Sequence, residues 1–321
     1  MKLVVIIPAY NEEKTIREVI RKIPRDIEGV SDVETIVIDD GSTDDTVRRA
    51  REAGASVFSN GRNQGVGFSF SRGLKEALKR DADIVVNIDA DGQFNPLDIP
   101  KLIDPILKNQ ADFVTASRFR DKNLTPKMPF LKIWGNRMVA RIINFITGGD
   151  FTDVSCGFRA FSREAALRLN LFGKFTYTQE TFINLHNKDM RICEVPLKIR
   201  GEREFGKSKI ASGFFYPIVY GYKSLLIILT AFRDYQPMRF FGSFGVIFGL
   251  IGFISGIFVF IHWLITGMTF PYRSLVILSV AFLILGLLFF VTGLLADMLS
   301  RNRKIQEEIL YLEKKRSYRK K

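Results

Sequence analysis

Two long stretches near the end of this 321-residue chain carry no formally charged residue. They are Phe240–Tyr272 and Ser274–Ala296, separated only by a short connection around Pro271. Each stretch exceeds the roughly 20 residues that an α-helix needs to span the hydrocarbon core of a bilayer. We therefore expect a hairpin of two transmembrane helices, which we prefer to a buried helix pair in a soluble core.

The charges at the open end of this hairpin predict its orientation. Arg233 and Arg239 precede the first stretch, and Ser300–Lys321 holds nine basic and three acidic residues. Because cytoplasmic segments beside membrane spans are rich in Lys and Arg, we expect both termini and the N-terminal region in the cytoplasm. The formal net charge is +13, and its concentration in the tail favours contact with acidic membrane lipid over nucleic acid.

The first two thirds of the chain alternate between patterns typical of strands and of helices. Strands are expected at Lys2–Ile7, Glu34–Ile38, Ala55–Ser59 and Ile84–Ile88. The expected helices are one capped by Asn11 and ending near Ile23, one capped by Ser42 or Thr43 with Gly54 after it, and one from Asn63–Gly67 to about Arg80. This alternation predicts an α/β domain with a largely parallel sheet.

The chain divides into four expected parts. These are an α/β domain at 1–210, juxtamembrane helices at 211–238, two transmembrane helices at 239–299 and a basic cytoplasmic tail at 300–321. The juxtamembrane stretch Phe214–Phe232 mixes Tyr and Lys with apolar residues. That mixture suits a helix lying in the membrane interface, and equally a helix packed on the domain.

The fourth strand ends in two carboxylates, Asp89 and Asp91, followed by Gly92 and Gln93. Ligands of open α/β sheets bind at the carboxyl ends of the strands, where these side chains emerge. Carboxylate and amide oxygens suit Mg²⁺ or Mn²⁺ rather than zinc, and Mg²⁺ is usually held by one or two carboxylates together with substrate phosphates. The stretch therefore predicts a metal-bound diphosphate, although a lone pair of acids also occurs in ordinary turns.

Two further motifs follow neighbouring strands. Pro8-Ala9-Tyr10-Asn11-Glu12 follows the first strand, and Asp39-Asp40-Gly41-Ser42 follows the second. With Asp89-Ala90-Asp91, this ordered set resembles the family 2 glycosyltransferases of GT-A fold, over roughly residues 1–235. Ser117-Arg118-Phe119 and Gly157-Phe158-Arg159 resemble segments of the polyprenyl-phosphate sugar synthases, the dolichol-phosphate mannose synthases among them.

The resemblance implies roles for the donor site. Pro8, Tyr10 and Glu12 would line the nucleoside pocket, with Asp40 on the base. Asp89 would lie beside the ribose and phosphate, and Asp91 with Gln93 would hold Mg²⁺ or Mn²⁺. Asp39, Asn63 and Ala90 complete the implied set of donor-binding residues.

Positive side chains in the middle region suit an anionic acceptor. The expected acceptor-phosphate residues are Arg118, Lys132, Asn136, Ser155, Arg200, Lys207 and Lys209. Arg118 and Arg200 are the strongest candidates, because a guanidinium fork matches phosphate geometry, whereas ordinary surface charge explains many of the others. Arg118 follows an expected strand at Asp112–Thr115, Lys132 lies on an expected helix at Phe130–Phe145, and Arg200 follows an expected strand near Glu194–Ile199. Lys132 and Asn136 depart from the arginine and serine of the resembled subgroup.

Together these features imply an inverting transfer of one hexose from a nucleotide sugar to polyprenyl or dolichyl phosphate. GDP-mannose is the first choice of donor, with UDP-glucose or UDP-N-acetylglucosamine next. The acceptor is already anionic, so no general base is required, and Glu180 is the candidate if one is used. Asp89, Asp91, Arg118 and Arg200 are the residues expected to carry the reaction.

Two other functions remain open. Gln236-Pro237-Met238-Arg239-Phe240 resembles the Q-x-x-R-W element of processive polysaccharide synthases, although two spans are few for a polymer channel. A membrane-tethered nucleotide-sugar-binding scaffold without catalysis would not need the intact set of metal ligands. The oligomeric state is also open, a homo-oligomer included.

Overall fold

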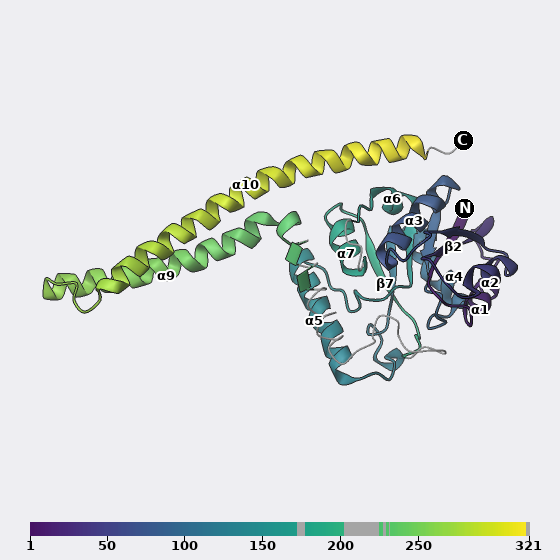
Figure 1. The fold of residues 1–321 in the computed structure, drawn as a ribbon, viewed down its shortest axis with the longest axis horizontal. Coiled ribbons are helices and arrows are strands. Elements are labelled where there is room, and N and C mark those ends of the chain that lie inside the picture. Colours follow the sequence, from purple (N-terminus) through teal and green to yellow (C-terminus); the bar gives the residue numbers. More distant parts are fainter. Residues whose placement is uncertain (172–176, 202–224, 227–228, 231, 319–321) are drawn as a thin grey trace. The chain divides into compact units, whose positions relative to one another are not determined.

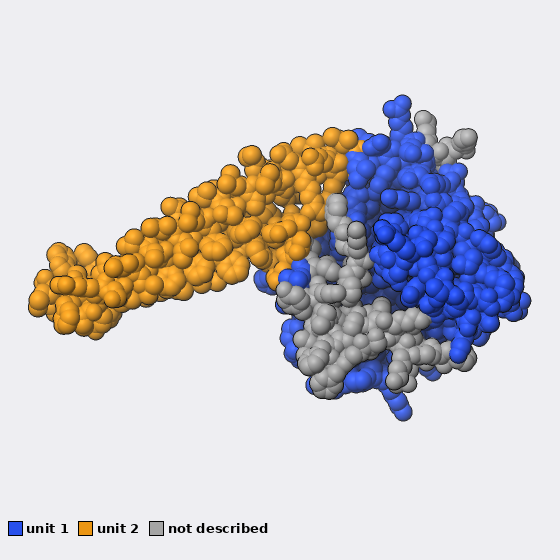
Figure 2. Space-filling model, in the orientation of Figure 1, with its two compact units in different colours: residues 1–228, 310–321 blue, residues 229–309 orange. Residues whose placement is uncertain are grey.

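The computed structural model describes residues 1–171, 177–201, 225–226, 229–230 and 232–318 (Figure 1). The chain forms two compact units, one of residues 1–228 with 310–321 and one of residues 229–309 (Figure 2). The expected boundary at residue 210 and most of the stretch Phe214–Phe232 lie outside the described residues.

The first unit is built on a seven-stranded sheet in the order β3-β2-β1-β4-β6-β5-β7. The strands are β1 (Lys2–Ala9), β2 (Asp32–Asp39), β3 (Ser56–Ser59), β4 (Ile84–Asn87), β5 (Phe113–Ser117), β6 (Arg159–Ser162) and β7 (Ile192–Pro196). Only β6 pairs antiparallel with its neighbours, β4 and β5. The fold class is therefore the expected α/β arrangement with a largely parallel sheet, and the last strand lies nearer the N-terminus than the expected Glu194–Ile199.

Helices cover both faces of the central strand. Leu3, Val5 and Ile7 of β1 share one buried cluster with apolar side chains of α1 (Ile16–Arg21) and α4 (Ile99–Leu107). On the other face, a Cβ at Gly73 of α3 (Val66–Lys79) would lie 3.1 Å from Cδ1 of Ile6. The continuous apolar run of β1 thus reflects burial on two faces.

The remaining elements of this unit connect the strands. They are α2 (Thr46–Glu52), η1 (Pro96–Asp98), η2 (Lys122–Leu124), α5 (Phe130–Thr147), α6 (Arg163–Arg168) and α7 (Thr178–His186). The expected end of α2 at Gly54 is confirmed by its left-handed backbone, with φ of 89°. The helix opening near Gly65 is confirmed as well.

Two expected helix caps are wrong. Asn11 has a left-handed backbone with φ of 52°, and α1 begins only at Ile16, after Thr15. Ser42 and Thr43 do not cap α2 either, because that helix begins at Thr46 after Asp45. These polar residues instead bond to one another between the two turns, an interaction that local cap patterns do not reveal.

The sheet order determines where the functional motifs meet. The carboxyl ends of β1, β2, β4, β5 and β7 all lie at one edge, and the antiparallel β6 begins there. Chain order runs outward from β1 through β2 to β3 and then returns to β4 on the other side of β1. The point where the order reverses, between β1 and β4, is where open α/β sheets bind their ligands.

The second unit contains α9 (Pro237–Thr266) and most of α10 (Arg273–Ser317). Both helices are long and apolar enough to cross a membrane, with mean hydropathies of 2.6 and 2.9 in their most apolar windows. Their backbones touch, since a Cβ at Gly252 would lie 2.8 Å from the Leu283 amide nitrogen and one at Gly286 would lie 2.8 Å from that of Gly249. Small residues permit this close approach of two apolar helices.

The basic tail is largely helical. Helix α10 continues without a break to Ser317, and its last turns contact α6 within the first unit. Nζ of Lys314 donates to the carbonyl oxygen of Leu169 (3.1 Å) and to Oδ1 of Asn170 (2.7 Å), just past the end of α6. The Arg168 guanidinium lies 4.0 Å from the centre of the Tyr311 ring. Part of the tail charge is thus bound to the domain surface.

Candidate active site

The turns after β1 and β2 are joined by hydrogen bonds. The Asn11 amide nitrogen donates to Oγ of Ser42 (2.9 Å), and Oδ1 of Asn11 accepts from the Thr43 nitrogen (2.8 Å). The Glu12 nitrogen donates to Oγ1 of Thr46 (2.7 Å). The turn that carries Pro8, Tyr10 and Glu12 is therefore fixed relative to the turn that carries Asp39 and Asp40.

Both acids after β2 organise neighbouring backbone. The Asp40 carboxylate accepts from the nitrogens of Gln64 and Gly65, each at 2.9 Å, and from Nδ2 of Asn60 (2.8 Å). Asp39 accepts from the Ser42 nitrogen (2.9 Å) and Oγ of Ser59 (2.7 Å). Asp40 thus holds the loop that carries Asn63 at the start of α3, and its contact with a base stays a prediction.

Asp89 and Asp91 follow β4 at the reversal point. Oδ1 of Asp91 accepts from the Gln93 nitrogen (3.0 Å), so the loop closes on this buried side chain. Nε2 of Gln93 donates to the carbonyl oxygen of Arg200 (3.3 Å). Gly157 lies against Asp89, since a Cβ there would be 2.8 Å from Oδ2 of that carboxylate. The loop before β6 therefore packs directly on the first acid of the motif.

This set of oxygen atoms fits a divalent cation that is held partly by a substrate. Two carboxylates and a side-chain amide are hard donors of the kind that Mg²⁺ and Mn²⁺ prefer. In the part of the chain that the structure describes, no group of three or more His, Cys, Asp or Glu residues gathers that could hold a metal. The chemistry of Asp91 and Gln93 is thus compatible with such a cation, and their role as its ligands stays a prediction.

A buried arginine that the sequence analysis did not select fixes the loop beside Asp89. The guanidinium of Arg159 donates to the carbonyl oxygens of Cys156 (2.7 Å), Thr178 (2.9 Å) and Val154 (3.1 Å). Its complete burial lowers the pKa of Arg159. Arg159 thereby connects the loop before β6 to the start of α7, which carries the buried Glu180.

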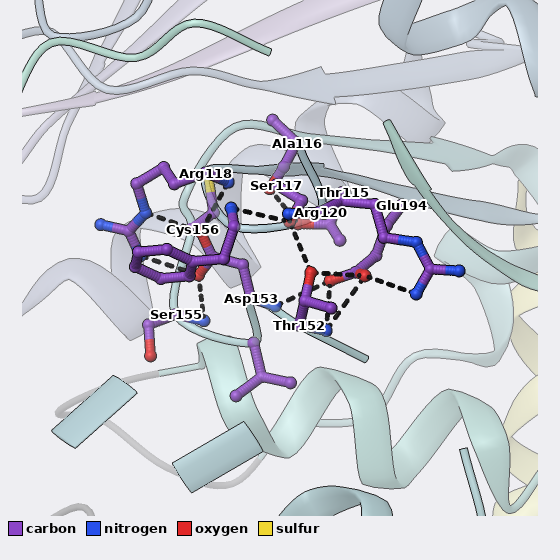
Figure 3. Close-up of polar contacts among 12 residues, drawn as sticks. Thr115, Ala116, Ser117, Arg118, Arg120, Thr152, Asp153, Ser155, Cys156 and Glu194 are labelled. Carbon is purple, nitrogen blue, oxygen red and sulfur yellow. Dashed lines mark hydrogen bonds and ion pairs between the residues drawn. The ribbon is translucent and has the colours of Figure 1, made fainter. Parts of the chain in front are cut away.

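The expected acceptor residues gather partly around Arg118. Its Nε and Nη2 bind the two oxygens of Asp153 at 2.6 and 2.7 Å, as Figure 3 shows. Desolvation and then the positive charge of Arg118 lower the pKa of Lys132, which lies on α5. One turn further along α5, Nδ2 of Asn136 is buried without a hydrogen-bond partner among the described residues. Arg118 thus lies just past the end of β5, while Lys132 and Asn136 lie one turn apart on one face of α5.

Of the other expected acceptor residues, the structure describes Arg200 and Ser155, and the Ser155 nitrogen donates to Oδ1 of Asp153 (3.2 Å), which Nη2 of Arg118 also binds. Arg200 lines a cavity of about 400 Å³ with Gln93, Lys198 and Glu18 of α1. Its backbone nitrogen donates to the carbonyl oxygen of Gln93 (3.2 Å), so it adjoins the donor motif. Oγ of Ser155 accepts from Nε2 of Gln179 (3.4 Å). Lys207 and Lys209 lie outside the described residues.

Comparison with known proteins gives the class of this enzyme. The family model described as "Glycosyl transferase family 2" matches residues 4–169. The chain therefore belongs to glycosyl transferase family 2, and it is a sugar-transferring enzyme.

Relatives differ in their sugars. The UDP-N-acetylglucosamine–dolichyl-phosphate N-acetylglucosaminyltransferase of Methanococcus voltae is 34% identical over 214 residues, which cover 60% of this chain and 83% of the relative. The dolichol-phosphate mannosyltransferase of Pyrococcus furiosus is 34% identical over 219 residues, which cover 65% of this chain and 59% of the relative.

A solved structure has the same fold. It is the glucosyl-3-phosphoglycerate synthase of Mycobacterium tuberculosis in complex with Mn²⁺, UDP and phosphoglyceric acid. Its TM-score is 0.56 at 27% identity, over 72% of this chain and 78% of that chain.

The contact between Gly157 and Asp89 generates a prediction. Gly157→Ala should displace the Asp89 carboxylate and weaken nucleoside diphosphate binding by about tenfold or more, the effect of losing a charge-assisted contact. Calorimetric titration with the diphosphate and Mg²⁺ measures this. Gly135→Ala in α5, where a Cβ would meet no atom within 4 Å, is the matched control. If Gly157→Ala binds the nucleoside diphosphate with unchanged affinity, Asp89 is not part of the donor site.

Proposed function

We propose that this protein is an inverting, metal-dependent transferase that moves one hexose from a nucleotide sugar to polyprenyl or dolichyl phosphate at the cytoplasmic membrane face. The observation that carries the proposal is Arg118 just past β5, at the same sheet edge as Asp89 and Asp91, with Lys132 and the unpartnered Asn136 amide one turn apart on α5. Two cations and an unpartnered amide donor suit a phosphate group. Both relatives carry a dolichyl phosphate acceptor in their names.

The donor half of the proposal rests on the turns after β1, β2 and β4. GDP-mannose is the donor proposed first, with UDP-glucose and UDP-N-acetylglucosamine next. The two relatives named above are equally identical to this chain and use different sugars, so a side-by-side donor screen makes the choice.

The chemistry needs little proton transfer. A phosphate oxygen of the acceptor attacks C1 of the hexose while the bond from C1 to the diphosphate oxygen breaks, and the configuration at C1 inverts. A divalent cation bound by Asp91 and Gln93 would neutralise charge on the departing diphosphate. Arg118, Lys132 and Asn136 would hold the acceptor phosphate in line, and Arg200 would contact it from the side of Gln93.

The surface of α5 supports a membrane-borne acceptor. Phe130, Trp134 and Phe145 are exposed along one side of this helix, with Arg137 and Arg141 between them. Residues spaced by three and four positions share a helix face. Aromatic and basic side chains on one face are typical of a helix that lies among lipid head groups. Lys132 and Asn136 lie on the opposite side of α5, so the aromatic face would hold the helix at the membrane while the acceptor phosphate reaches the other side.

Transfer to lipid phosphate is the test of this function. Purified full-length protein, Mg²⁺, one of the three donors and a polyprenyl phosphate should yield a lipid that carries one hexose. A growing polysaccharide would instead indicate a processive synthase, and tight donor binding without any product would indicate a scaffold.

The acceptor site predicts a selective defect in Lys132→Ala. Removing a charge-assisted contact with phosphate should lower acceptor efficiency about ten- to hundredfold, from roughly 1.5–3 kcal/mol. Donor affinity should stay unchanged. Initial rates against lipid phosphate and calorimetry with the donor measure the two effects, and Lys108→Ala, at the residue that follows α4, is the control. We expect the same defect in Arg200→Ala. If a variant loses donor affinity and keeps its response to lipid phosphate, the residue that was replaced belongs to the diphosphate site.

The metal ligands predict dependence on a divalent cation. Asp91→Asn removes a charged ligand, so transfer should fall to background, and excess chelator should have the same effect on the wild-type protein. Restoration of wild-type activity by added Mg²⁺ or Mn²⁺ identifies the ion. Full activity in chelator would contradict the assignment.

The apolar hairpin predicts the topology. In a Cys193→Ser background, cysteines placed at Ser31 and Ser317 should react with an impermeant reagent only after the cells are opened. A cysteine at Thr269, between the two apolar helices, should react in intact cells. If the cysteine placed at Ser317 is labelled in intact cells, the result contradicts the orientation derived from the positive-inside rule.

A further inference from the structure

Glu194 on β7 is a buried carboxylate whose oxygens face backbone donors. Its side chain is 4% exposed. The carboxylate accepts from the Thr152 nitrogen (2.9 Å), the Asp153 nitrogen (2.7 Å) and Oγ1 of Thr152 (2.9 Å), as Figure 3 shows. The nearest nitrogen of the Arg120 guanidinium is 3.9 Å away. Glu194 therefore holds the loop between α5 and β6 chiefly through hydrogen bonds.

The residues held by Glu194 in turn hold Arg118. Asp153 accepts from Nε and Nη2 of Arg118 and from its backbone nitrogen (3.1 Å). Oγ1 of Thr152 lies 2.8 Å from Oγ of Ser117, the residue before Arg118. A continuous chain of contacts thus runs from β7 through the loop to the end of β5 and the Arg118 fork.

The chemistry of these contacts favours an ionised acceptor at position 194. An ionised carboxylate only accepts hydrogen bonds, and the two backbone nitrogens that it meets can only donate. Burial raises the pKa of Glu194, while the hydrogen bonds from Asp153 and Thr152 oppose that rise and the charge of Asp153 adds to it. A glutamine that kept both backbone bonds through Oε1 would turn its N–H₂ group toward the Thr152 nitrogen, which donates to Oε2 of Glu194 (3.0 Å), and would reverse the bond with Oγ1 of Thr152.

We infer that Glu194 is a positioning residue for the acceptor phosphate. It fixes Thr152 and Asp153, and Asp153 fixes the Arg118 guanidinium just past the end of β5. Glu194 does not itself contact substrate, so its effect reaches the reaction only through Arg118. This inference rests on the proposed function, because it assigns Arg118 and Lys132 to the acceptor.

The test separates acceptor use from donor use in full-length protein. Glu194→Gln should raise the KM for polyprenyl phosphate about tenfold or more, the scale of a charge-assisted contact. The affinity for nucleoside diphosphate with Mg²⁺ should remain within about twofold, and so should donor hydrolysis by water without acceptor. Glu34→Gln, a strand glutamate paired with Lys2 and Arg80, is the matched control and should change none of these values.

A second variant keeps the inference testable if Glu194→Gln folds poorly. Asp153→Asn preserves the shape of that side chain and weakens its contacts with Arg118, so it should give the same increase in acceptor KM. In a double variant that folds, the two effects should be less than additive, because both act through one chain of contacts.

Several outcomes would overturn the inference. Folded variants with unchanged acceptor KM would show that the network does not position the acceptor. A parallel loss of donor affinity, donor hydrolysis and thermal stability would assign Glu194 to the fold alone. If the wild-type protein transfers no sugar to any polyprenyl phosphate, the proposed function itself fails, and that result is distinct from a wild-type response in Glu194→Gln.

Discussion

The candidate active site depends on the buried guanidinium of Arg159. Burying an unpaired charge is costly unless hydrogen bonds compensate it, and here three carbonyl oxygens from two segments do so. The rings of Phe182 and Phe113 lie 5.2 and 5.5 Å from the guanidinium carbon and exclude water from it. This guanidinium joins the loop before β6 to the start of α7, to which Ser155 of the loop is also bonded through Gln179. Gly157 lies in that loop against Asp89, and Asp153 lies in it against Arg118. One interaction therefore supports both the proposed donor side and the proposed acceptor side of the site.

The two sides are built in different ways. On the donor side, short polar side chains such as Asn11, Ser42 and Thr46 connect adjacent turns of the same sheet edge. On the acceptor side, the buried acids Glu194 and Asp153 connect β7, β5 and a loop that lie far apart in sequence. A carboxylate that accepts hydrogen bonds from backbone and guanidinium groups fixes both the distance and the orientation of those groups, because each hydrogen bond prefers a narrow range of angles. The acceptor side is therefore organised by charge, and the donor side by turn geometry.

Sequence patterns predicted the elements whose signals are local. Neighbouring residues alone indicated the structure in three cases: the apolar run of β1, the glycines at 54 and 65, and the two uncharged stretches. The placement of Asp89 and Asp91 at a ligand-binding edge also followed, because strand ends and strand direction were enough. The helix caps at Asn11 and Ser42 were wrong because a polar residue before a helix is equally able to bond to a neighbouring turn. The position of β7 was wrong by two or three residues, since a half-buried strand leaves a weak pattern at its ends.

The sequence by itself determined the class of fold, the order of the motifs at one sheet edge and the two apolar helices. These depend on periodicity, on carboxylates after strands and on length without charge, all of which are properties of contiguous residues. Only the tertiary structure decided which charges meet. It paired Arg118 with Asp153, set Arg200 beside Gln93 and joined Lys314 to the end of α6. The physical reason is that an ion pair or a buried hydrogen bond depends on distances of a few ångströms between segments, and spacing along the chain does not contain those distances.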